Sequence, residues 1–546
     1  MTDPGSSTLP GETPTGETPG SGSLGRNTAI MAVGTLMSRI SGFGRIVALA
    51  YALGFGRLAD TYTLANNTPN MIYELIVGGV LSSTLVPVFV KHLNSDDEEE
   101  GWRAISAIVS CIAVAMVVLT VIFLLGAPLL VKAYSLSSKS PNSAQELHLA
   151  TSLVRFFAPQ VVCYGIIATA TALLHAQRRF AAPMFAPILN NVVVIGVILY
   201  LPHLIGQVSV SRVGNDFGAV SFLGLGTTFG VVAMTLALIP ALHNSHLRLR
   251  WRWEPRNPAV VTVVRLSGWT FGFVIANQLA LFVVQFLAYG HKGDVSAYVA
   301  AYTLFIFPHG VFAVSVMSAL QPGLATAWQR NARRDFADQT TLGLRLGGFV
   351  LLPAAAGYVV IAVPLVAAIL KYGRLDAASA LTTGHVFAYM AIGLPGFSAF
   401  LFLTRVFQSM HDTKTVFLLY LVENGANVVL ALALYRTFGV VGLGFALGAA
   451  YWTGTLAALI VLSRRVPELH LRDVCSSLAR IAAAAAASTT TAWLCVRATS
   501  GTTELVQVGV AVIAGGSLFF VAARLLRIPE MALLLDVRRR RPVSAS

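Results

Sequence analysis

This chain of 546 residues is 55% hydrophobic and only 11% charged, and its mean hydropathy is +0.71. A soluble domain of this size does not have such a balance, which is typical of a polytopic membrane protein. The formal net charge of +14 could indicate nucleic-acid binding, but in a membrane protein it more often comes from cytoplasmic loops that face anionic lipid, so no nucleic-acid partner is expected.

The first residues differ in composition from the rest of the chain. Residues 1–25 are rich in Gly, Pro, Ser and Thr and lack the basic and apolar regions of a cleaved signal peptide, so we expect a disordered cytoplasmic tail. About fourteen apolar runs of membrane-spanning length follow, which predicts an all-α polytopic membrane protein. They lie near residues 28–51, 62–90, 104–131, 149–175, 181–205, 218–243, 259–289, 295–325, 344–370, 382–410, 414–435, 440–463, 476–496 and 504–526.

Lysine and arginine indicate how these spans are oriented. They are concentrated in the even-numbered connections and in the C-terminal tail, as in the basic stretches 248–256 and 538–541, and are sparse in the odd-numbered connections. Because basic loops stay in the cytoplasm, both termini are expected to be cytoplasmic. The acidic run 96–100 lies in an even-numbered connection, but acidic residues contribute little to topology, and we interpret it as a solvated loop.

The chain is also internally similar. Residues 191–194 resemble residues 427–430 at an offset of about 236 residues, which favours two parallel halves of six spans around a central cavity, as in many transporters. The predicted units are a disordered tail (1–25), an N-terminal lobe of helices 1–6 (26–245), a basic cytoplasmic linker (246–258), a C-terminal lobe of helices 7–12 (259–465), helices 13 and 14 (466–527) and a basic cytoplasmic tail (528–546).

No catalytic motif is present in the sequence. There is no G-x-S-x-G, no ATP-binding P-loop, no H-E-x-x-H and no pair of carboxylates near a histidine. The four cysteines have no C-x-x-C spacing, so neither a metal site nor a disulfide framework is expected. We infer that the protein is not an enzyme, and that any transport draws on an ion gradient, the membrane potential or the gradient of the substrate.

Two arginines lie in the middle of the first, glycine-rich span. Arg39 and Arg45 are six residues apart, so a helix places them roughly 120° apart around its axis. An arginine at membrane depth costs at least about 2.5–3.5 kcal/mol and usually faces a cavity or a partner. Since guanidinium groups bind phosphate bidentately, we predict that this pair binds an anionic substrate. Arg265 lies nearer a span end, where an arginine often extends to the interface.

The eleventh span carries a different polar group. Glu423 and Asn427 are four residues apart and share one helix face, which is a plausible site for a hard cation or a proton. Asn277 in the seventh span could add an oxygen if the two spans touch. The alternatives are a structural hydrogen bond between helices and an ion pair of Glu423 with a cavity arginine. Sodium ion or proton coupling is therefore an expectation, and no other cofactor is expected.

Several short motifs carry a resemblance to a known family. They are spread from about Gly25 to Arg527 and are specific as a set. The clearest are Ser38-Arg39 with Gly42-Phe43-x-Arg45, Ala59-Asp60, Pro69-Asn70, Phe307-Pro308-x-Gly310-Val311 and Gly393-Leu394-Pro395. On these motifs the chain resembles the MurJ/MviN family of lipid II flippases, in the multidrug/oligosaccharidyl-lipid/polysaccharide exporter superfamily. Tyr73-Glu74-Leu75 with Gly78-Gly79-Val80 looks like the actinobacterial version.

The resemblance implies a fold, a substrate and a location. It implies fourteen helices, two six-helix lobes around a cationic cavity, and a groove for the lipid tail on helices 13 and 14. The family moves lipid II, the undecaprenyl-diphosphate-linked precursor of peptidoglycan, across the bacterial cytoplasmic membrane by alternating access, among membrane lipids and alongside cell-wall synthesis or division proteins. Arg39 and Arg45 match the arginines that bind the diphosphate, and Asp60 matches a functionally important acid, which we predict to be part of the substrate-binding site.

The chain departs from the family pattern at two places. Some members carry an arginine pair in helix 2 where this chain has Tyr73 and Glu74, and an Asp-Arg pair in helix 8 where it has Tyr302 and Thr303. The cavity should therefore be less cationic, and Arg265 is our candidate for the missing charge. The alternative functions are a flippase for another polyprenyl-linked glycan and a non-transporting scaffold for cell-envelope synthesis. A cation-coupled drug exporter would prefer an acidic cavity, which the two mid-membrane arginines argue against.

Overall fold

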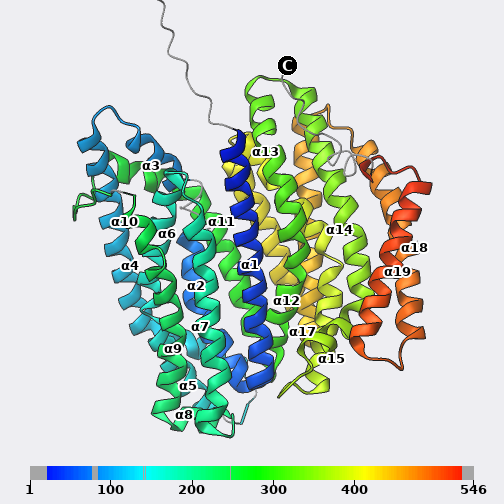
Figure 1. Ribbon diagram of the computed structural model, residues 1–546, viewed down its shortest axis with the longest axis horizontal. Helices are drawn as coiled ribbons and strands as arrows, with labels where there is room; N and C mark the ends of the chain where they lie inside the picture. The colour runs from blue at the N-terminus through cyan, green and yellow to red at the C-terminus, as the bar shows by residue number, and fades with distance from the viewer. Residues whose placement is uncertain (1–20, 77–83, 139, 142, 246, 532–546) are drawn as a thin grey trace, which may run out of the picture.

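The computed structural model describes residues 21–76, 84–138, 140–141, 143–245 and 247–531. Every element of regular structure in these ranges is a helix, which confirms the predicted all-α fold. Figure 1 shows two bundles of helices side by side, with α1 between them and α18 and α19 at the far edge of the second bundle. The helix α1 begins at one end of the molecule, and the short helix α8 lies at the other, which we call the outer end.

The first bundle is built from the N-terminal half of the chain. Buried apolar side chains from α1 to α9, such as Phe89, Phe157 and Leu223, form its core. Its helices are α1 (Ser21–Leu53), α2 (Arg57–Ile76), α3 (Val86–Leu93), α4 (Glu98–Ser135), α5 (Ser143–Phe157), α6 (Gln160–Ala176), α7 (Ala181–Ile205), α8 (Val210–Asn215), α9 (Phe217–Leu236) and α10 (Ile239–His243).

The second bundle has a larger core, centred on Phe305, Phe387 and Phe400. Its first helix, α11, joins the two bundles, because Ala259 near its start packs in the first core and Ala288 at its end packs in the second. The elements are α11 (Pro258–Ala288), α12 (Asp294–Pro308), the π-helix η2 (His309–Ala313), α13 (Val314–Gln329), α14 (Arg333–Leu370), α15 (Ala377–Ala391), α16 (Leu394–Ser409), α17 (Thr413–Arg465), α18 (Leu471–Ala498) and α19 (Glu504–Leu525).

The number of membrane spans depends on how bent helices are divided. Ten described helical segments are long and apolar enough to cross a membrane, or eleven if the bent pair α15 and α16 forms one span. The 53-residue α17 contains the predicted spans 11 and 12, which meet at Gly439, a residue with a positive φ of 57° that interrupts the helix. The helix α18 is less apolar, because Ala, Ser and Thr fill its middle. The predicted span 62–90 includes residues 77–83, which lie outside the described ranges.

Both predicted tails differ from the structure at their inner boundaries. The helix α1 begins at Ser21, so residues 21–25 are helical, whereas residues 1–20 lie outside the described ranges. Residues 528–531 are packed into the fold rather than free. The fully buried carboxylate of Glu530 accepts hydrogen bonds from the Arg345 side chain and the Ser477 hydroxyl, and this ties the C-terminal end of α19 to α14 and α18.

Candidate functional site

A cavity of about 350 Å³ lies between the two bundles, with walls from α2, α11, α12 and α17. Its lining is rich in amide side chains and tyrosines, groups that exchange hydrogen bonds without carrying a charge. The amides are Asn67, Asn70, Asn277, Gln278, Gln285, Asn424 and Asn427, and the tyrosines are Tyr298, Tyr302 and Tyr451. The two charged residues in the described lining are both acids, Glu74 and Glu423. The resemblance to the family implied a cationic cavity, and that expectation is wrong for this chamber.

Glu423 is the more deeply placed of the two acids. Its side chain is 1% exposed, and its Oε2 atom has no hydrogen-bond partner among the described residues. The Oδ1 atom of Asn427, one turn along the same face of α17, also lacks a partner. Because α11 and α17 pack along each other, Asn277 reaches the same cavity, as the sequence required. Buried oxygens without partners are costly, so these atoms are suited to a bound cation or proton.

The alternatives for Glu423 receive no support from its surroundings. Glu423 has no ion pair with any residue in the described ranges, so it is not neutralised by a cavity arginine. The same ranges contain no group of three or more His, Cys, Asp or Glu that could hold a metal ion. An alkali cation bound mainly by amide and carboxylate oxygens needs no such group.

Arg39 reaches from α1 to the second bundle. Its guanidinium lies against Gly310 in the π-helix η2, where a Cβ atom would come within 2.6 Å of Arg39 Cζ. The Nε atom of Arg39 is buried and has no hydrogen-bond partner in the described part of the chain. Tyr302, which lines the cavity, lies within electrostatic range of this guanidinium. Arg39 therefore stands beside the cavity with an unused donor, and π-helical turns of this kind are frequent at functional sites.

Arg45 lies on a different side of α1. Its guanidinium interacts electrostatically with Tyr62 on α2 and Tyr164 on α6, both in the first bundle. The two arginines thus face opposite bundles, which their separation of about 120° around the helix allows. The sequence identified both residues but did not show that they are divided between the two halves of the molecule.

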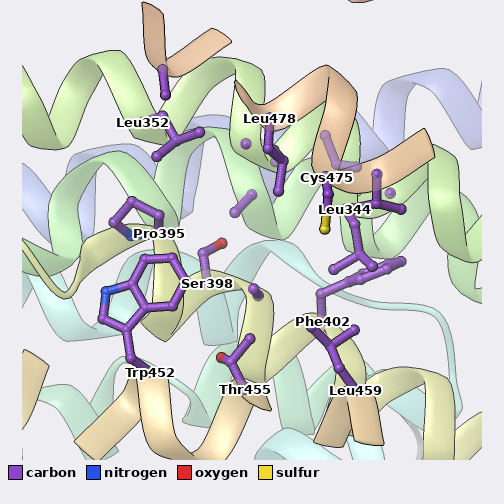
Figure 2. Close-up of a pocket in the computed structure, with 18 of the residues that line it drawn as sticks. Leu344, Leu352, Pro395, Ser398, Phe402, Trp452, Thr455, Leu459, Cys475 and Leu478 are labelled. Carbon is purple, nitrogen blue, oxygen red and sulfur yellow. The ribbon is translucent and has the colours of Figure 1, made fainter. Parts of the chain in front are cut away.

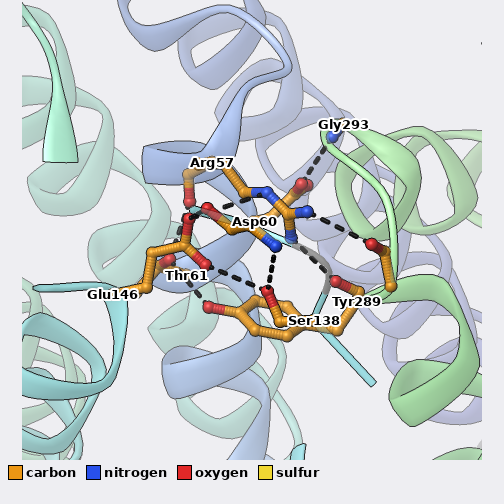
Figure 3. Close-up of polar contacts among 9 residues, drawn as sticks. Arg57, Asp60, Thr61, Ser138, Glu146, Tyr289 and Gly293 are labelled. Carbon is orange, nitrogen blue, oxygen red and sulfur yellow. Dashed lines mark hydrogen bonds and ion pairs between the residues drawn. The ribbon is translucent and has the colours of Figure 1, made fainter. Parts of the chain in front are cut away.

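Asp60 is fully buried in the first turn of α2, at the outer end, and does not line the cavity; Figure 3 shows its contacts. Its buried carboxylate accepts hydrogen bonds from the backbone N–H of Gly293 and from the backbone N–H and hydroxyl of Ser296, at 3.0 and 2.8 Å for the two Ser296 donors. These donors belong to the first turn of α12, so Asp60 on α2 caps a helix of the other bundle. We predicted that Asp60 binds substrate, whereas its contacts in the structure join the two bundles.

Arg57 strengthens the same junction, one helical turn away from Asp60. It donates to the carbonyl oxygens of Tyr289 at 2.7 Å and Gly290 at 3.2 Å, and its Nε lies 3.7 Å from the largely buried carboxylate of Glu146 (Figure 3). The Thr61 hydroxyl lies 3.2 Å from the Tyr289 hydroxyl. We refer to the contacts of Arg57, Asp60 and Thr61 with the second bundle as the outer latch. The sequence analysis missed Arg57, because a lone arginine between two spans is not distinctive.

Tight glycine turns close the outer end further. Gly54 and Gly293 have φ angles of +65° and +88°, and a Cβ atom on either would lie within 2.8 Å of a carbonyl oxygen of the other bundle's facing loop. The backbone N–H of Arg374 donates to the Tyr51 carbonyl at 3.0 Å. The α1–α2, α11–α12 and α14–α15 connections are thus in direct contact. The structure is closed at its outer end.

Arg265 does not join the cavity. It is exposed on α11 between Val264 and Leu266, which are 68% and 57% exposed. Twelve residues separate it from Asn277, which turns the helix by about 1200° and leaves the two side chains roughly 120° apart. This position fits an arginine that extends from an apolar helix surface to the interface. The structure gives no support for Arg265 as the replacement for the missing family arginines.

A second, apolar pocket of about 390 Å³ lies between α18 and the helices α13, α14, α16 and α17. Figure 2 shows Leu352, Trp452 and Leu478 among the side chains around this space. Small residues on α14 and α18, including Gly347 and Ala482, keep it open. We call it the apolar groove. The resemblance placed a lipid-tail groove on helices 13 and 14, whereas here four helices of the second bundle supply most of the wall.

The comparisons with known proteins agree with this architecture. The family model described as "Lipid II flippase MurJ" matches residues 49–510. The chain belongs to the MurJ family. It is therefore a transporter and not an enzyme, and a multi-pass protein of a bacterial inner membrane. Arg39 and Arg45 precede the matched region, so their assignment depends on the motifs around them and on their positions in the structure.

Individual relatives are similar over most of their length. The chain is 27% identical over 449 residues to a probable lipid II flippase MurJ of Rhizobium meliloti, covering 81% of both chains. It is 26% identical over 387 residues to the lipid II flippase MurJ of Burkholderia cenocepacia, covering 70% of this chain and 72% of the relative. Among solved structures, lipid II flippase MurJ in an inward closed conformation matches with a TM-score of 0.74 at 19% identity, over 91% of this chain and 99% of that one.

A more distant structure shows how widely the fold is shared. An inward-facing multidrug resistance MATE family transporter of the MOP superfamily has a TM-score of 0.65 at 12% identity, covering 80% of this chain and 98% of that one. This match shows a shared arrangement of the two bundles and nothing more, because the sequence identity is too low to indicate a shared function. The MurJ assignment therefore depends on the family match rather than on the shape of the molecule.

Proposed function

We propose that this protein moves lipid II from the inner to the outer leaflet of the cytoplasmic membrane by alternating access. Membership of the MurJ family carries this proposal, and the polar cavity between two bundles supports it. A bilayer-spanning cavity gives the sugar–peptide headgroup a hydrated path that the hydrocarbon core does not offer.

The closed outer latch is the basis on which we assign this structure to a conformation closed towards the outside. With both termini in the cytoplasm, as the distribution of basic residues predicts, the outer end faces away from the cytoplasm. A transporter that is closed at its outer end can exchange its ligand only with the cytoplasmic leaflet, and opening of the latch would release that ligand outside. We therefore assign Asp60 to the gate between the bundles.

The two arginines are suited to the diphosphate of lipid II. Arg39 has a buried Nε without a partner beside the cavity, and Arg45 is half-buried one and a half turns along α1. Their planar guanidinium groups can bind phosphate oxygens bidentately, which suits capture of a diphosphate. Since Arg39 faces the second bundle and Arg45 faces the first, they would engage the ligand from opposite sides of α1.

The apolar groove is suited to part of the polyprenyl tail. Lipid tails are as apolar as leucine, so the groove gains little from burial alone and serves instead to guide the tail. Its described polar members, Ser398 and Thr455, do not change its character, since the Thr455 hydroxyl is already bonded to the Gly396 carbonyl at 2.8 Å. The tail would then remain on the lipid side of the second bundle while the headgroup crosses.

Glu423, Asn427 and Asn277 form the proposed cation-coupling site. The support is the pair of unpartnered oxygens on Glu423 and Asn427 in a shared cavity wall. Sodium would use these oxygens as ligands, whereas a proton would neutralise Glu423 alone. Either ion would stabilise the conformation in which α11 and α17 bring the oxygens together.

The test is depletion of the protein in its host, followed by chemical identification of the undecaprenyl-linked precursor that accumulates in the inner leaflet. Rescue is then measured with Arg39→Ala and Arg45→Ala, which should insert normally and fail to restore lipid II at the cell surface. Accumulation of a different polyprenyl-linked glycan would replace lipid II as the substrate. Full rescue by both variants would overturn the diphosphate site.

A further inference from the structure

The cavity has an uneven distribution of charge. Glu74 on α2 and Glu423 on α17 belong to opposite bundles and line the same chamber of about 350 Å³. Tyr302 on α12 lies within electrostatic range of both carboxylates and also of Arg39. The chamber is therefore acidic within, and the cationic Arg39 stands at its border. Glu74 occupies a position at which the resemblance led us to expect an arginine.

This arrangement excludes a diphosphate from the acidic part of the chamber. A diphosphate placed beside either carboxylate would be repelled by it, because like charges disfavour each other. Neither Glu74 nor Glu423 has an ion pair with a residue in the described ranges. The Glu423 carboxylate is buried without a cation, which is costly, and the Glu74 carboxylate is exposed where it lines the chamber. Both acids are therefore suited to a positively charged ligand group.

The other lining residues favour an organic cation over a bare metal ion. Tyr298, Tyr302 and Tyr451 place aromatic rings around the chamber, and ring faces attract ammonium groups. The seven lining amides can donate to and accept from sugar hydroxyls and peptide groups. The chamber is also far larger than one ion needs. These properties match a peptide or sugar that carries an ammonium group.

We propose that the cavity is bipolar: Glu74 and Glu423 bind an ammonium group of the headgroup peptide, which takes the place of the coupling cation at Glu423, while Arg39 binds the diphosphate. This inference rests on the proposed function, and the ammonium would be the side-chain amine of a diamino acid in the peptide of lipid II. Glu74 is then a specificity-determining residue, because it rejects headgroups in which that amine is absent or neutralised. The two charges of the ligand would also fix its orientation in the chamber.

The experiment compares two forms of one ligand. Full-length protein in phosphatidylcholine nanodiscs is titrated with lipid II that contains lysine, either with its side-chain amine free or with that amine acetylated. We expect wild-type protein to prefer the free amine by about fivefold, the upper end of the effect of one partly exposed ion pair. Glu74→Gln should reduce this preference to less than about twofold. Glu99→Gln removes an equal charge from the exposed loop at the start of α4 and should leave the preference unchanged.

Three outcomes would refute either the bipolar cavity or the proposed function. Equal affinity of wild-type protein for both ligands, or an unchanged preference in Glu74→Gln, would refute the bipolar cavity while leaving the flippase function intact. Failure of wild-type protein to bind either form of lipid II would instead refute the proposed function.

Discussion

The outer latch offers a direct test of the alternating-access assignment. Replacing Asp60 by alanine removes a buried carboxylate that accepts three hydrogen bonds from the first turn of α12, two of them from Ser296 and one from Gly293. All three donors lie in the opposite bundle, so these bonds exist only while the outer end is closed. The substitution should therefore destabilise the closed state relative to the outward-open state.

The size of this effect follows from the bonds that are lost. A hydrogen bond to a charged group contributes about 1.5–3 kcal/mol, and the backbone N–H groups of Gly293 and Ser296 lose their acceptor when the carboxylate is removed. Part of this loss is regained, because those N–H groups reach water when the latch opens. A net shift of about 3 kcal/mol is a reasonable expectation, and it changes the ratio of closed to open molecules by roughly 100-fold.

Distance measurements between the bundles can report this shift. Spin labels are attached at Ser211 on α8 and Ala378 on α15, which are exposed at the outer end of the first and second bundles, in a background without the four native cysteines. Asp60→Ala should move the distance distribution to longer values. Asp97→Ala, which removes the N-cap of α4 but no contact between bundles, serves as the control. An Asp60→Ala distribution identical to that of the control would refute the latch.

Three further predictions concern the arginine, the ion site and the groove. Gly310→Ala should displace the Arg39 guanidinium, because the added Cβ atom would lie 2.6 Å from Arg39 Cζ. The variant should insert normally and flip lipid II about tenfold more slowly. An unchanged flipping rate would contradict the close contact. Glu423→Gln should remove any sodium or proton dependence of flipping, and a dependence that persists would exclude this carboxylate from coupling. Gly347→Phe should fill the apolar groove and slow flipping. Gly357→Phe is the control: Gly357 is also on α14, and at either glycine a Cβ atom would have no neighbour within 4 Å, but Gly357 does not line the groove. Equal flipping rates of the two variants would show that the tail does not use the groove.

The acidic chamber also changes one argument made from composition. We argued that a cation-coupled drug exporter would prefer an acidic cavity and that two mid-membrane arginines oppose that function. The structure contains both features, since the chamber is acidic and Arg39 stands beside it. Cavity polarity alone therefore does not separate the members of this superfamily. In this chain, the family match decides between them.

The sequence by itself determined the helical class, the membrane location and the importance of α1. Long apolar runs can satisfy their backbone only as helices in a bilayer, and an arginine in such a run is too costly to be without a role. These conclusions depend on local composition, which the sequence displays directly. The shared face of Glu423 and Asn427 also followed from a spacing of four residues within one helix.

The tertiary structure alone decided which residues meet across the two bundles. Asp60 and Gly293 are 233 positions apart in the chain, and no local pattern indicates that one caps the helix beginning at the other. For the same reason, the sequence could not show that Arg265 is exposed outside the cavity lining or that Glu74 and Glu423 line the same cavity. Contacts between helices depend on how each helix is rotated and packed, and this is set by the surfaces of both helices together rather than by either sequence segment alone. The gate and the polarity of the chamber therefore appear only in the folded chain.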